Sequence, residues 1–191
     1  MELTTSYLNQ LTMIKAHIGA GPIHLDGWWN FDIDRRHEHC EQHGDVLQTH
    51  FNDNHFDVIY SCHFFEHLAY PIDSVECLNR FYKWLKPNGI IRMAVPDLEL
   101  AAKAYANGSD LKFLYGADFK GYYHKDLPAD RLNFFVKAWE HQCCYDFQLL
   151  SSMFADAGFI NIQKRNANES LIQGFNHDRF ISESLYIEAQ K

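Results

Sequence analysis

Two histidines and a glutamate fall within one five-residue stretch, His63-Phe64-Phe65-Glu66-His67. This spacing satisfies H-x-x-E-H, in which two imidazoles bind zinc while the glutamate acts as a base in hydrolysis. That chemistry requires a continuous helix with both histidines on one face, and a third, distant acidic ligand. Here the stretch directly follows a predicted strand, and Pro71 leaves room for two helical turns at most. Zinc hydrolysis is therefore the weaker interpretation of this stretch.

Further metal-ligand side chains occur at His37, His39, Cys40 and His43. Their neighbours are polar, which favours a solvated loop over a metal site. The chain has five cysteines and no C-x-x-C pair, so the sequence favours reduced thiols over a metal site or disulfides.

Glycines and a carboxylate lie at predicted strand ends, where open parallel sheets bind their ligands. Taken alone, Gly19-Ala20-Gly21 is more often a plain turn than a cofactor site, and Asp32 alone would be a surface or capping carboxylate. Gly19-Ala20-Gly21 follows a short apolar stretch, and a turn without Cβ atoms lets the backbone approach a ligand closely. Asp32 ends the next predicted strand, where a carboxylate accepts hydrogen bonds from ribose hydroxyls in dinucleotide folds. The motif G-x-G-x-x-G is absent, and residues 22–27 are too few for a crossover helix. A nicotinamide cofactor is therefore disfavoured.

A strand, a helix and a second strand are predicted in the middle of the chain. Residues 56–61 form an apolar strand, and apolar residues after Pro71 recur at the spacing of an amphipathic helix. The helix is expected to end at Lys86, before Pro87-Asn88-Gly89, and residues 90–95 form the next strand. This order predicts a crossover unit in a parallel sheet.

The flanking segments extend this pattern. Further short strands are predicted at 15–18, 29–32, 160–163 and 185–189. Asp146 is expected to cap a helix that Gly158 closes, and a helix over residues 5–12 is expected to cover one side of the sheet. Residues 108–140 form an aromatic-rich insert, either an irregular cover over the substrate or a helical packing element.

Composition limits the class of protein. The 191 residues suggest a single domain, 1–191, and 47% hydrophobic content is typical of a globular chain. A formal charge of −8 argues against nucleic-acid binding. The sequence contains no stretch of roughly 20 apolar residues that could span a membrane, and its first residues lack the layout of a secretory signal. A cytoplasmic location is therefore expected.

Taken in order, these segments resemble the class I S-adenosylmethionine-dependent methyltransferases, and within them the short bacterial methyltransferase-11-type proteins. The resemblance rests on His17-Ile18-Gly19-Ala20-Gly21, residues 27–34, Gly44-Asp45-Val46, residues 56–68, residues 85–99, and a tail that includes His141, Tyr145-Asp146 and residues 184–189. It implies an α/β Rossmann-like sandwich with a mostly parallel sheet and helices on both faces. The short link after Gly21 implies a minimal variant with a shortened first crossover.

The resemblance also implies a cofactor site for S-adenosyl-L-methionine. It assigns Gly19, Ala20 and Gly21 to the cofactor turn and Asp32 to the ribose. It places Ile33 against the adenine, Asp45 and Val46 at the adenine edge, and Ser61 near the methionine part. No metal is expected.

Methyl transfer to an alcohol would benefit from a general base, and imidazole suits neutral pH. His63 is the first candidate because it follows the strand end at Ser61. His141, at the end of the insert, is the second, and Asp97, after the strand at 90–95, is the third. Each of the three also has a purely structural interpretation.

The acceptor is expected to be a small molecule or a glycan, such as a precursor of a surface polysaccharide, and only the resemblance supports sugars. The alternative class is a non-catalytic protein with a methyltransferase fold that binds the cofactor or serves as a partner.

Overall fold

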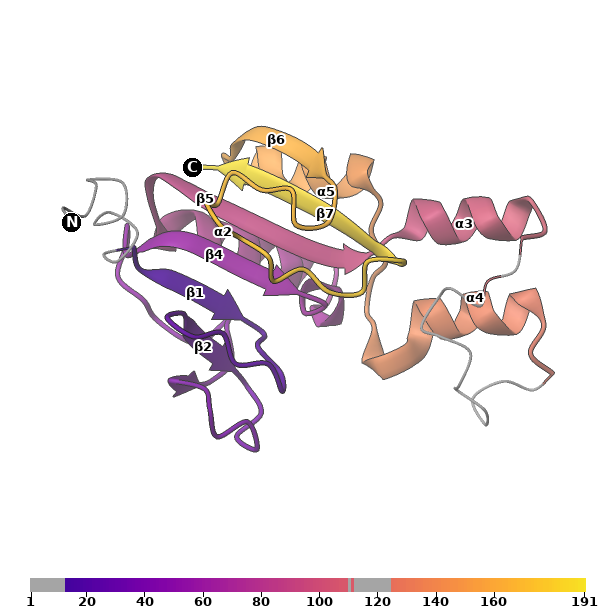
Figure 1. The fold of residues 1–191 in the computed structure, drawn as a ribbon, viewed down its shortest axis with the longest axis horizontal. Helices are drawn as coiled ribbons and strands as arrows, with labels where there is room; N and C mark the ends of the chain where they lie inside the picture. Colours follow the sequence, from indigo (N-terminus) through magenta and orange to yellow (C-terminus); the bar gives the residue numbers. More distant parts are fainter. Residues whose placement is uncertain (1–12, 110, 112–124) are drawn as a thin grey trace, which may run out of the picture.

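The computed structural model describes residues 13–109, 111 and 125–191, and its centre is a twisted sheet of seven strands (Figure 1). The strand order is β3-β2-β1-β4-β5-β7-β6. Strands β1 to β5 are parallel to one another, and β7 is antiparallel to both β5 and β6. The strands are β1 Lys15–Ile18, β2 Trp29–Asp32, β3 Gln42–His43, β4 Phe56–Cys62, β5 Leu85–Pro96, β6 Ile160–Arg165 and β7 Ser184–Gln190. The predicted α/β class with a mostly parallel sheet is confirmed.

The connection from β1 to β2 contains no helix in the described chain. Residues 19–28 make turns and return the chain so that Ala16 pairs with Trp29 in a parallel register. The prediction of a shortened first crossover is therefore confirmed. The helix expected at residues 5–12 lies outside the described residues.

Strand β4, helix α2 (Ile72–Trp84) and strand β5 form the predicted crossover unit. The predicted end of the helix was wrong by two residues. Leu85 is already extended (ψ 140°) and pairs with Phe56 of β4, so α2 ends at Trp84. The segment Pro87-Asn88-Gly89 consequently lies within β5, where Asn88 adopts a left-handed conformation (φ 64°).

Helices α2 and α5 (Phe147–Asp156) cover one face of the sheet (Figure 1). Asp146 caps α5 as predicted, because its carboxylate accepts a 2.8 Å hydrogen bond from the N–H of Leu149. Side chains from both helices and from alternate strand positions form the main core, which includes Leu78, Phe81, Leu150, Phe154, Ile18, Phe31, Ile59, Met93 and Ile187.

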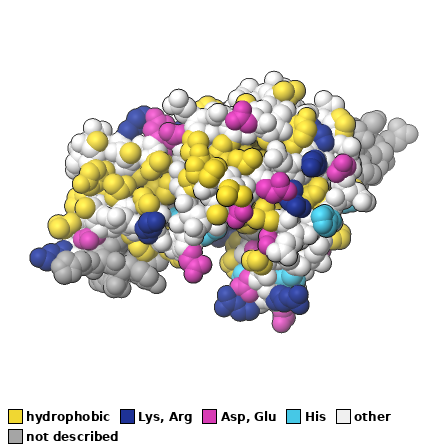
Figure 2. Space-filling model, turned by 180° about the vertical axis from the view of Figure 1, so that it is seen from behind, with side chains coloured by type: hydrophobic (Ala, Val, Ile, Leu, Met, Phe, Trp, Pro, Cys, Tyr) yellow, Lys and Arg dark blue, Asp and Glu magenta, His cyan; other side chains and the backbone are white. Residues whose placement is uncertain are grey.

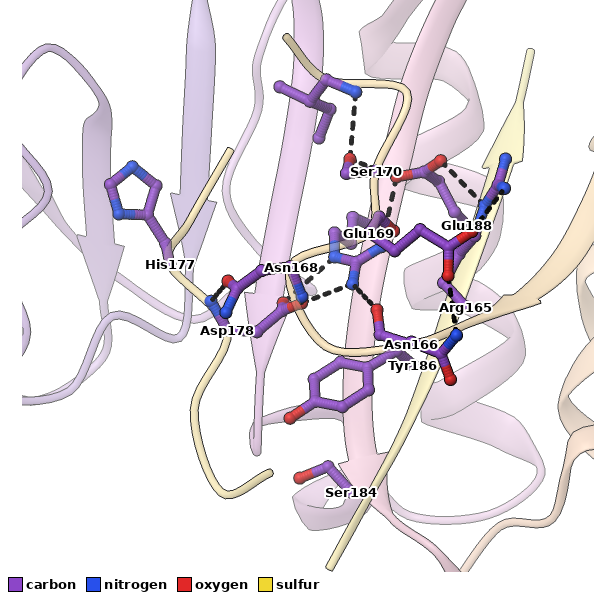
Figure 3. A network of polar contacts seen from close by, with 12 residues as sticks. Arg165, Asn166, Asn168, Glu169, Ser170, His177, Asp178, Ser184, Tyr186 and Glu188 are labelled. Carbon is purple, nitrogen blue, oxygen red and sulfur yellow. Dashed lines mark hydrogen bonds and ion pairs between the residues drawn. The ribbon is translucent and has the colours of Figure 1, made fainter. Parts of the chain in front are cut away.

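The opposite face is covered in the described chain by the non-helical segment 166–178, whose residues take part in a network of polar contacts (Figure 3). The buried Arg92 holds this segment in place. Arg92 of β5 donates hydrogen bonds to the carbonyl oxygens of Asn166 (3.0 Å) and Glu169 (2.9 Å). It also forms ion pairs with the buried carboxylates of Asp178 and Glu188. The expectation of helices on both faces is thus met on one face by α2 and α5 and replaced on the other by this segment, as far as the described residues go.

Helices α3 (Leu98–Ala106) and α4 (Pro128–Lys137) lie beyond the carboxyl end of β5 and pack against each other through a small separate core that includes Ala101, Leu111 and Phe135 (Figure 1). The short helix η3 (Ala138–Glu140) follows α4. The second half of the predicted insert is therefore helical, as its packing interpretation required, and residues 112–124 lie outside the described chain. None of the described helices is long and apolar enough to cross a membrane.

Candidate functional site

A cavity of about 360 Å³ lies at the carboxyl ends of β1 and β2, where open parallel sheets bind their ligands. Six of the eight residues predicted to bind the cofactor line it: Gly19, Gly21, Asp32, Ile33, Asp45 and Val46. These six residues come from three separate chain segments, which meet here because each lies at or just after a strand end.

The two glycines of the turn lie in different surroundings, so each has its own reason for being glycine. Gly19 (φ +71°) lies so close to Phe64 that a Cβ atom at position 19 would overlap the Phe64 side chain. Gly21 (φ +53°) instead faces open space, where a Cβ atom would meet no atom of the described chain within 4 Å. The turn is fixed by hydrogen bonds from the N–H groups of Gly19 (2.9 Å) and Ala20 (3.0 Å) to the carbonyl oxygen of Phe31. A backbone left open at Gly21 suits the close approach of a ligand.

Asp32 connects the glycine turn to the end of β2. Its Oδ2 atom accepts a hydrogen bond from the N–H of Gly21 (2.7 Å), and Oδ1 accepts one from the N–H of Asp34 (2.8 Å). A carboxylate offers about four acceptor positions, so each oxygen retains capacity for a ribose hydroxyl.

Ile33 and Asp45 form the opposite wall. The Ile33 side chain is 68% exposed, which is unusual for a large apolar residue at a cavity and fits a surface that a flat ring covers. Asp45 begins a local turn and accepts hydrogen bonds from the N–H of Leu47 (2.8 Å) and the amide of Gln48 (3.0 Å). Val46 is buried beside it.

The other two residues predicted to bind the cofactor lie differently. Ala20 lines a second cavity of about 220 Å³, which shares Gly19, Gly21 and His63 with the first. Ser61 is fully buried at the end of β4 and lines none of these cavities, and its Oγ has no hydrogen-bond partner among the described residues. Cys62, which the sequence analysis did not select, lines the second cavity because its side chain alternates to the other face of β4.

A third cavity, of about 720 Å³, opens beside the first two. Asp34, Arg36 and His37 from the loop after β2 form one wall, and Trp139 and His141 after α4 form another. Figure 2 shows the surface hollowed between the part that carries β2 and β3 and the part that carries α3 and α4. We call this third cavity the outer cavity.

His63 is the residue common to all three cavities. It adopts a left-handed backbone conformation (φ 51°) directly after β4, which turns its side chain toward the centre of the site. Its Nε2 lies 2.7 Å from the Oγ of Ser184, and its ring packs 4.4 Å from that of Phe180. Burial, aided by His141 and His67, lowers the pKa of His63 to about 3, so its imidazole is neutral at physiological pH.

Glu66 lies beneath His63 and is completely buried. Its Oε1 atom is 3.6 Å from Nδ1 of His63 and 4.0 Å from Nε2 of both His67 and His141. Burial raises the pKa of the Glu66 carboxyl to about 8 and lowers that of His141 to about 4. The site therefore contains one buried carboxyl group surrounded by three imidazoles, of which the sequence analysis selected only His63 and His141.

The zinc-hydrolase interpretation of H-x-x-E-H required one continuous helix. The structure instead has only the three-residue 3-10 helix η1 (Phe65–His67), so His63 lies before the helix and outside its face. The other predicted polar cluster, His37, His39, Cys40 and His43, does not bring together a set of metal ligands in the described part of the chain.

Asp97, the third candidate base, lies away from this site. Its carboxylate caps α3 by accepting a 3.0 Å hydrogen bond from the N–H of Leu100 and lies 3.3 Å from Nζ of Lys164. Asp97 lines none of the three cavities, which gives it the structural role of a helix cap.

These cavities fit a nucleoside cofactor with a charged, extended end. Asp32 supplies acceptors for a ribose, Ile33 an apolar surface for a base, and the open backbone at Gly21 leads into the second cavity. The first cavity falls within the usual size range of ligand pockets, roughly 300–1,000 Å³.

Comparison with known proteins supports the same cofactor. A family model described as a methyltransferase domain matches residues 11–164, and no curated protein matches the sequence. Among solved structures, an S-adenosylmethionine-dependent methyltransferase from Archaeoglobus fulgidus is 16% identical with a TM-score of 0.60, over 97% of this chain and 90% of that chain. Human N-acetylserotonin methyltransferase in complex with S-adenosylmethionine is also 16% identical, with a TM-score of 0.58.

The lengths of these neighbours differ. The match with the human enzyme includes 98% of this chain but only 50% of the human chain. A Bordetella parapertussis protein, 14% identical with a TM-score of 0.58, covers 94% of this chain, which spans 61% of that protein. At these identities the likeness shows the fold, whereas the domain match extends over most of the sequence. With the strand order and the cofactor cavity, it establishes that this chain belongs to the class I S-adenosylmethionine-dependent methyltransferases.

Proposed function

We propose that this chain methylates a hydroxyl group of a small-molecule or glycan acceptor, such as a surface-polysaccharide precursor, and that the acceptor binds in the outer cavity. The observation that carries this proposal is the position of His63. It is the one side chain among the described residues that lines the cofactor cavity, the second cavity and the outer cavity together.

When bound, S-adenosylmethionine supplies a methyl group on a positively charged sulfur. The chain would hold its ribose at Asp32 and its adenine at Ile33, while the buried walls around His63 keep water from the reacting atoms. Ala20, Cys62 and His63 in the second cavity would contact the remaining part. Such positioning is the main contribution of a protein to this chemistry.

His63 would accept the proton that the hydroxyl group loses. Its imidazole is neutral at physiological pH and can therefore accept a proton in this step. The positive charge that forms on the ring would lie 3.6 Å from the carboxyl group of Glu66, which balances this charge in its ionised form. His141, on the far side of Glu66, is the second candidate for this role.

Aromatic side chains in the outer cavity support a sugar or another ring-shaped molecule as the acceptor. Trp139 and Phe180 both line the outer cavity, and each is 47% exposed. An exposed aromatic face provides a stacking surface for a ring-shaped ligand. The excess of negative charge disfavours nucleic acid as acceptor, and a cytoplasmic location remains our prediction.

Methyl transfer is tested by incubating the protein with S-adenosylmethionine that carries an isotopically labelled methyl group. Sugar nucleotides and small alcohols serve as candidate acceptors, and mass spectrometry detects labelled product. We expect His63→Asn to lower kcat by about 100-fold or more. His50→Asn, an exposed position outside the cavities, is the control. A protein that binds the cofactor but labels no acceptor would instead support the non-catalytic partner role.

A further inference from the structure

Three side chains with metal-binding atoms meet at the floor of the outer cavity. Glu66 and His67 come from η1, and His141 follows η3. Their ligand atoms all lie within 4.8 Å of one another, and Oε1 of Glu66 lies 4.0 Å from Nε2 of each histidine. We propose that Glu66, His67 and His141 bind a divalent transition-metal ion of the zinc class.

The burial of Glu66 points independently to a bound cation. Its side chain has no exposed surface, and neither carboxyl oxygen has a hydrogen-bond partner among the described residues. Burying a carboxyl group without partners is costly, and native proteins rarely keep such a group without an ion, a water molecule or a function to account for it. A metal ion between Glu66 and the two imidazoles would supply the missing partner.

The hydrogen bond of His141 prepares it as a ligand. Its Nδ1 lies 3.1 Å from the carbonyl oxygen of Phe135, which can only accept, so Nδ1 carries the ring hydrogen. The lone pair is then on Nε2, the atom that faces Glu66. Histidine ligands of metals characteristically donate their other ring N–H to a backbone carbonyl or a carboxylate, which fixes the ring and its tautomer.

Backbone hydrogen bonds hold the two halves of the trio together. The carbonyl oxygen of Glu66 accepts from the N–H of Gln142 (2.8 Å) and lies 3.3 Å from the N–H of Cys143. The rings of His67 and His141 are 5.1 Å apart and nearly perpendicular (76°). Zinc ligands at about 2.0–2.2 Å from the metal lie roughly 3.5 Å from one another, so small side-chain rotations are enough to close the site.

The ligand set determines which ion fits. Two imidazole nitrogens with one carboxylate oxygen suit zinc, cobalt or ferrous iron, whereas magnesium and calcium prefer oxygen ligands. Three protein ligands leave a coordination position open, as in catalytic zinc sites. Here that position would face the outer cavity beside His63, where it could hold the acceptor oxygen. That last role rests on the proposed methyl transfer, but metal binding does not.

The site differs from the one that H-x-x-E-H implies. In that motif both histidines bind the metal while the glutamate acts as a base. In this fold His63 turns its Nε2 to Ser184, and Glu66 takes the place of a ligand with His141, which is 75 residues farther along the chain. The sequence motif and the proposed site therefore share only two residues.

Metal binding is tested with the full chain after dialysis against a chelator. Calorimetric titration with zinc chloride gives stoichiometry and affinity, and visible absorption after addition of cobalt(II) reports its coordination. The wild-type protein and His39→Ala, a control in the other histidine-rich segment, are expected to bind one equivalent. Glu66→Gln and His141→Ala are expected to bind at least 10-fold more weakly.

Zinc is also expected to raise the Tm of the wild type and of His39→Ala, and to leave that of Glu66→Gln unchanged. His67→Ala, at a partly exposed position, replaces any variant that does not fold. Absence of saturable binding by the wild type, or wild-type affinity in the ligand variants, would overturn the proposal. Titration of the same samples with S-adenosylmethionine separates this outcome from a failure of the cofactor site, since Glu66→Gln should retain cofactor binding.

Discussion

The carboxylate of Asp32 accepts a 2.7 Å hydrogen bond from the backbone N–H of Gly21, and this bond ties the end of β2 to the turn that follows β1. Two parts of the predicted cofactor site, eleven residues apart in the sequence, are thus joined directly. The bond also explains how a glycine turn without a crossover helix keeps its shape. In place of a helix N-terminus, a side-chain oxygen accepts the N–H group of the turn.

Asp32→Asn tests the proposed ribose contact. The amide retains one acceptor oxygen for the backbone but loses the charge and the second acceptor. A hydrogen bond to a charged group contributes about 1.5–3 kcal/mol, so we expect S-adenosylmethionine to bind roughly 10- to 100-fold more weakly. Isothermal titration calorimetry measures this, with Asp53→Asn on an exposed loop as the control. Equal affinity of both variants and the wild type would place the ribose elsewhere.

Gly21→Ala tests whether the open space at the turn belongs to the cofactor. Gly21 and Gly108 have similar backbone conformations (φ +53° and +66°), and a Cβ atom at either position meets no atom of the described residues within 4 Å. Both alanine variants should therefore lose a similar free energy of unfolding, about 1–2 kcal/mol. Only Gly21→Ala should lose cofactor affinity, by about 10-fold or more. An equal loss of affinity in Gly108→Ala would contradict this assignment.

Arg92→Met tests the network that holds segment 166–178 against the sheet (Figure 3). The substitution leaves the buried carboxylate of Asp178 without its cation and leaves Glu188 with only Arg165, 3.4 Å away. Breaking a buried pair in this way costs about 3–5 kcal/mol. Urea denaturation should show this loss. Lys103→Ala removes an exposed ion pair with Glu99 and should change the free energy of unfolding by less than about 1 kcal/mol. Similar losses of unfolding free energy in the two variants would show that the buried network stabilises the fold no more than an exposed ion pair does.

His17→Gln tests a pH dependence of stability. Burial lowers the pKa of His17 to about 4 from its ordinary 6.5, while His177 and His39 lower it further and Asn30 and Asp32 partly offset the shift. Between pH 6.5 and 4 the unfolded chain binds more protons than the folded chain, so acidification destabilises the fold. The full contribution of His17 is about 3 kcal/mol.

We therefore expect the free energy of unfolding of the wild type to fall from pH 7 to pH 4 more steeply than that of His17→Gln. Other buried histidines, including His63 and His141, keep part of the slope in the variant. Chemical denaturation at several pH values measures the two slopes. His50→Gln is the exposed control, and an identical slope in His17→Gln and the wild type would refute the assignment.

Most of the fold was predictable because the strands and helices follow local patterns. The apolar run in β4, the apolar spacing in α2 and the cap at Asp146 each depend on residues close in sequence. The end of α2 was misplaced because Leu85 pairs with Phe56, a contact between distant residues that no local pattern reveals. The packing of segment 166–178 on the second face of the sheet was likewise not predictable from local sequence, because Arg92 and Asp178 are 86 residues apart.

The candidate site divides in the same way. Six of the predicted cofactor residues meet in one cavity because strand ends in a parallel sheet lie along one edge. Asp97 was misleading, since a residue after a strand can equally cap the next helix. Glu66 and His67 could not be joined to His141 from sequence, because the backbone contacts of Gln142 and Cys143 that align them are tertiary.

The most direct test of the cofactor assignment is a crystal structure of the protein with S-adenosylhomocysteine. Our account predicts the ribose hydroxyls within hydrogen-bond distance of Asp32, the adenine against Ile33, and the homocysteine end in the second cavity near Ala20 and Cys62. A ligand bound outside these cavities, or no bound ligand at saturating concentration, would contradict it.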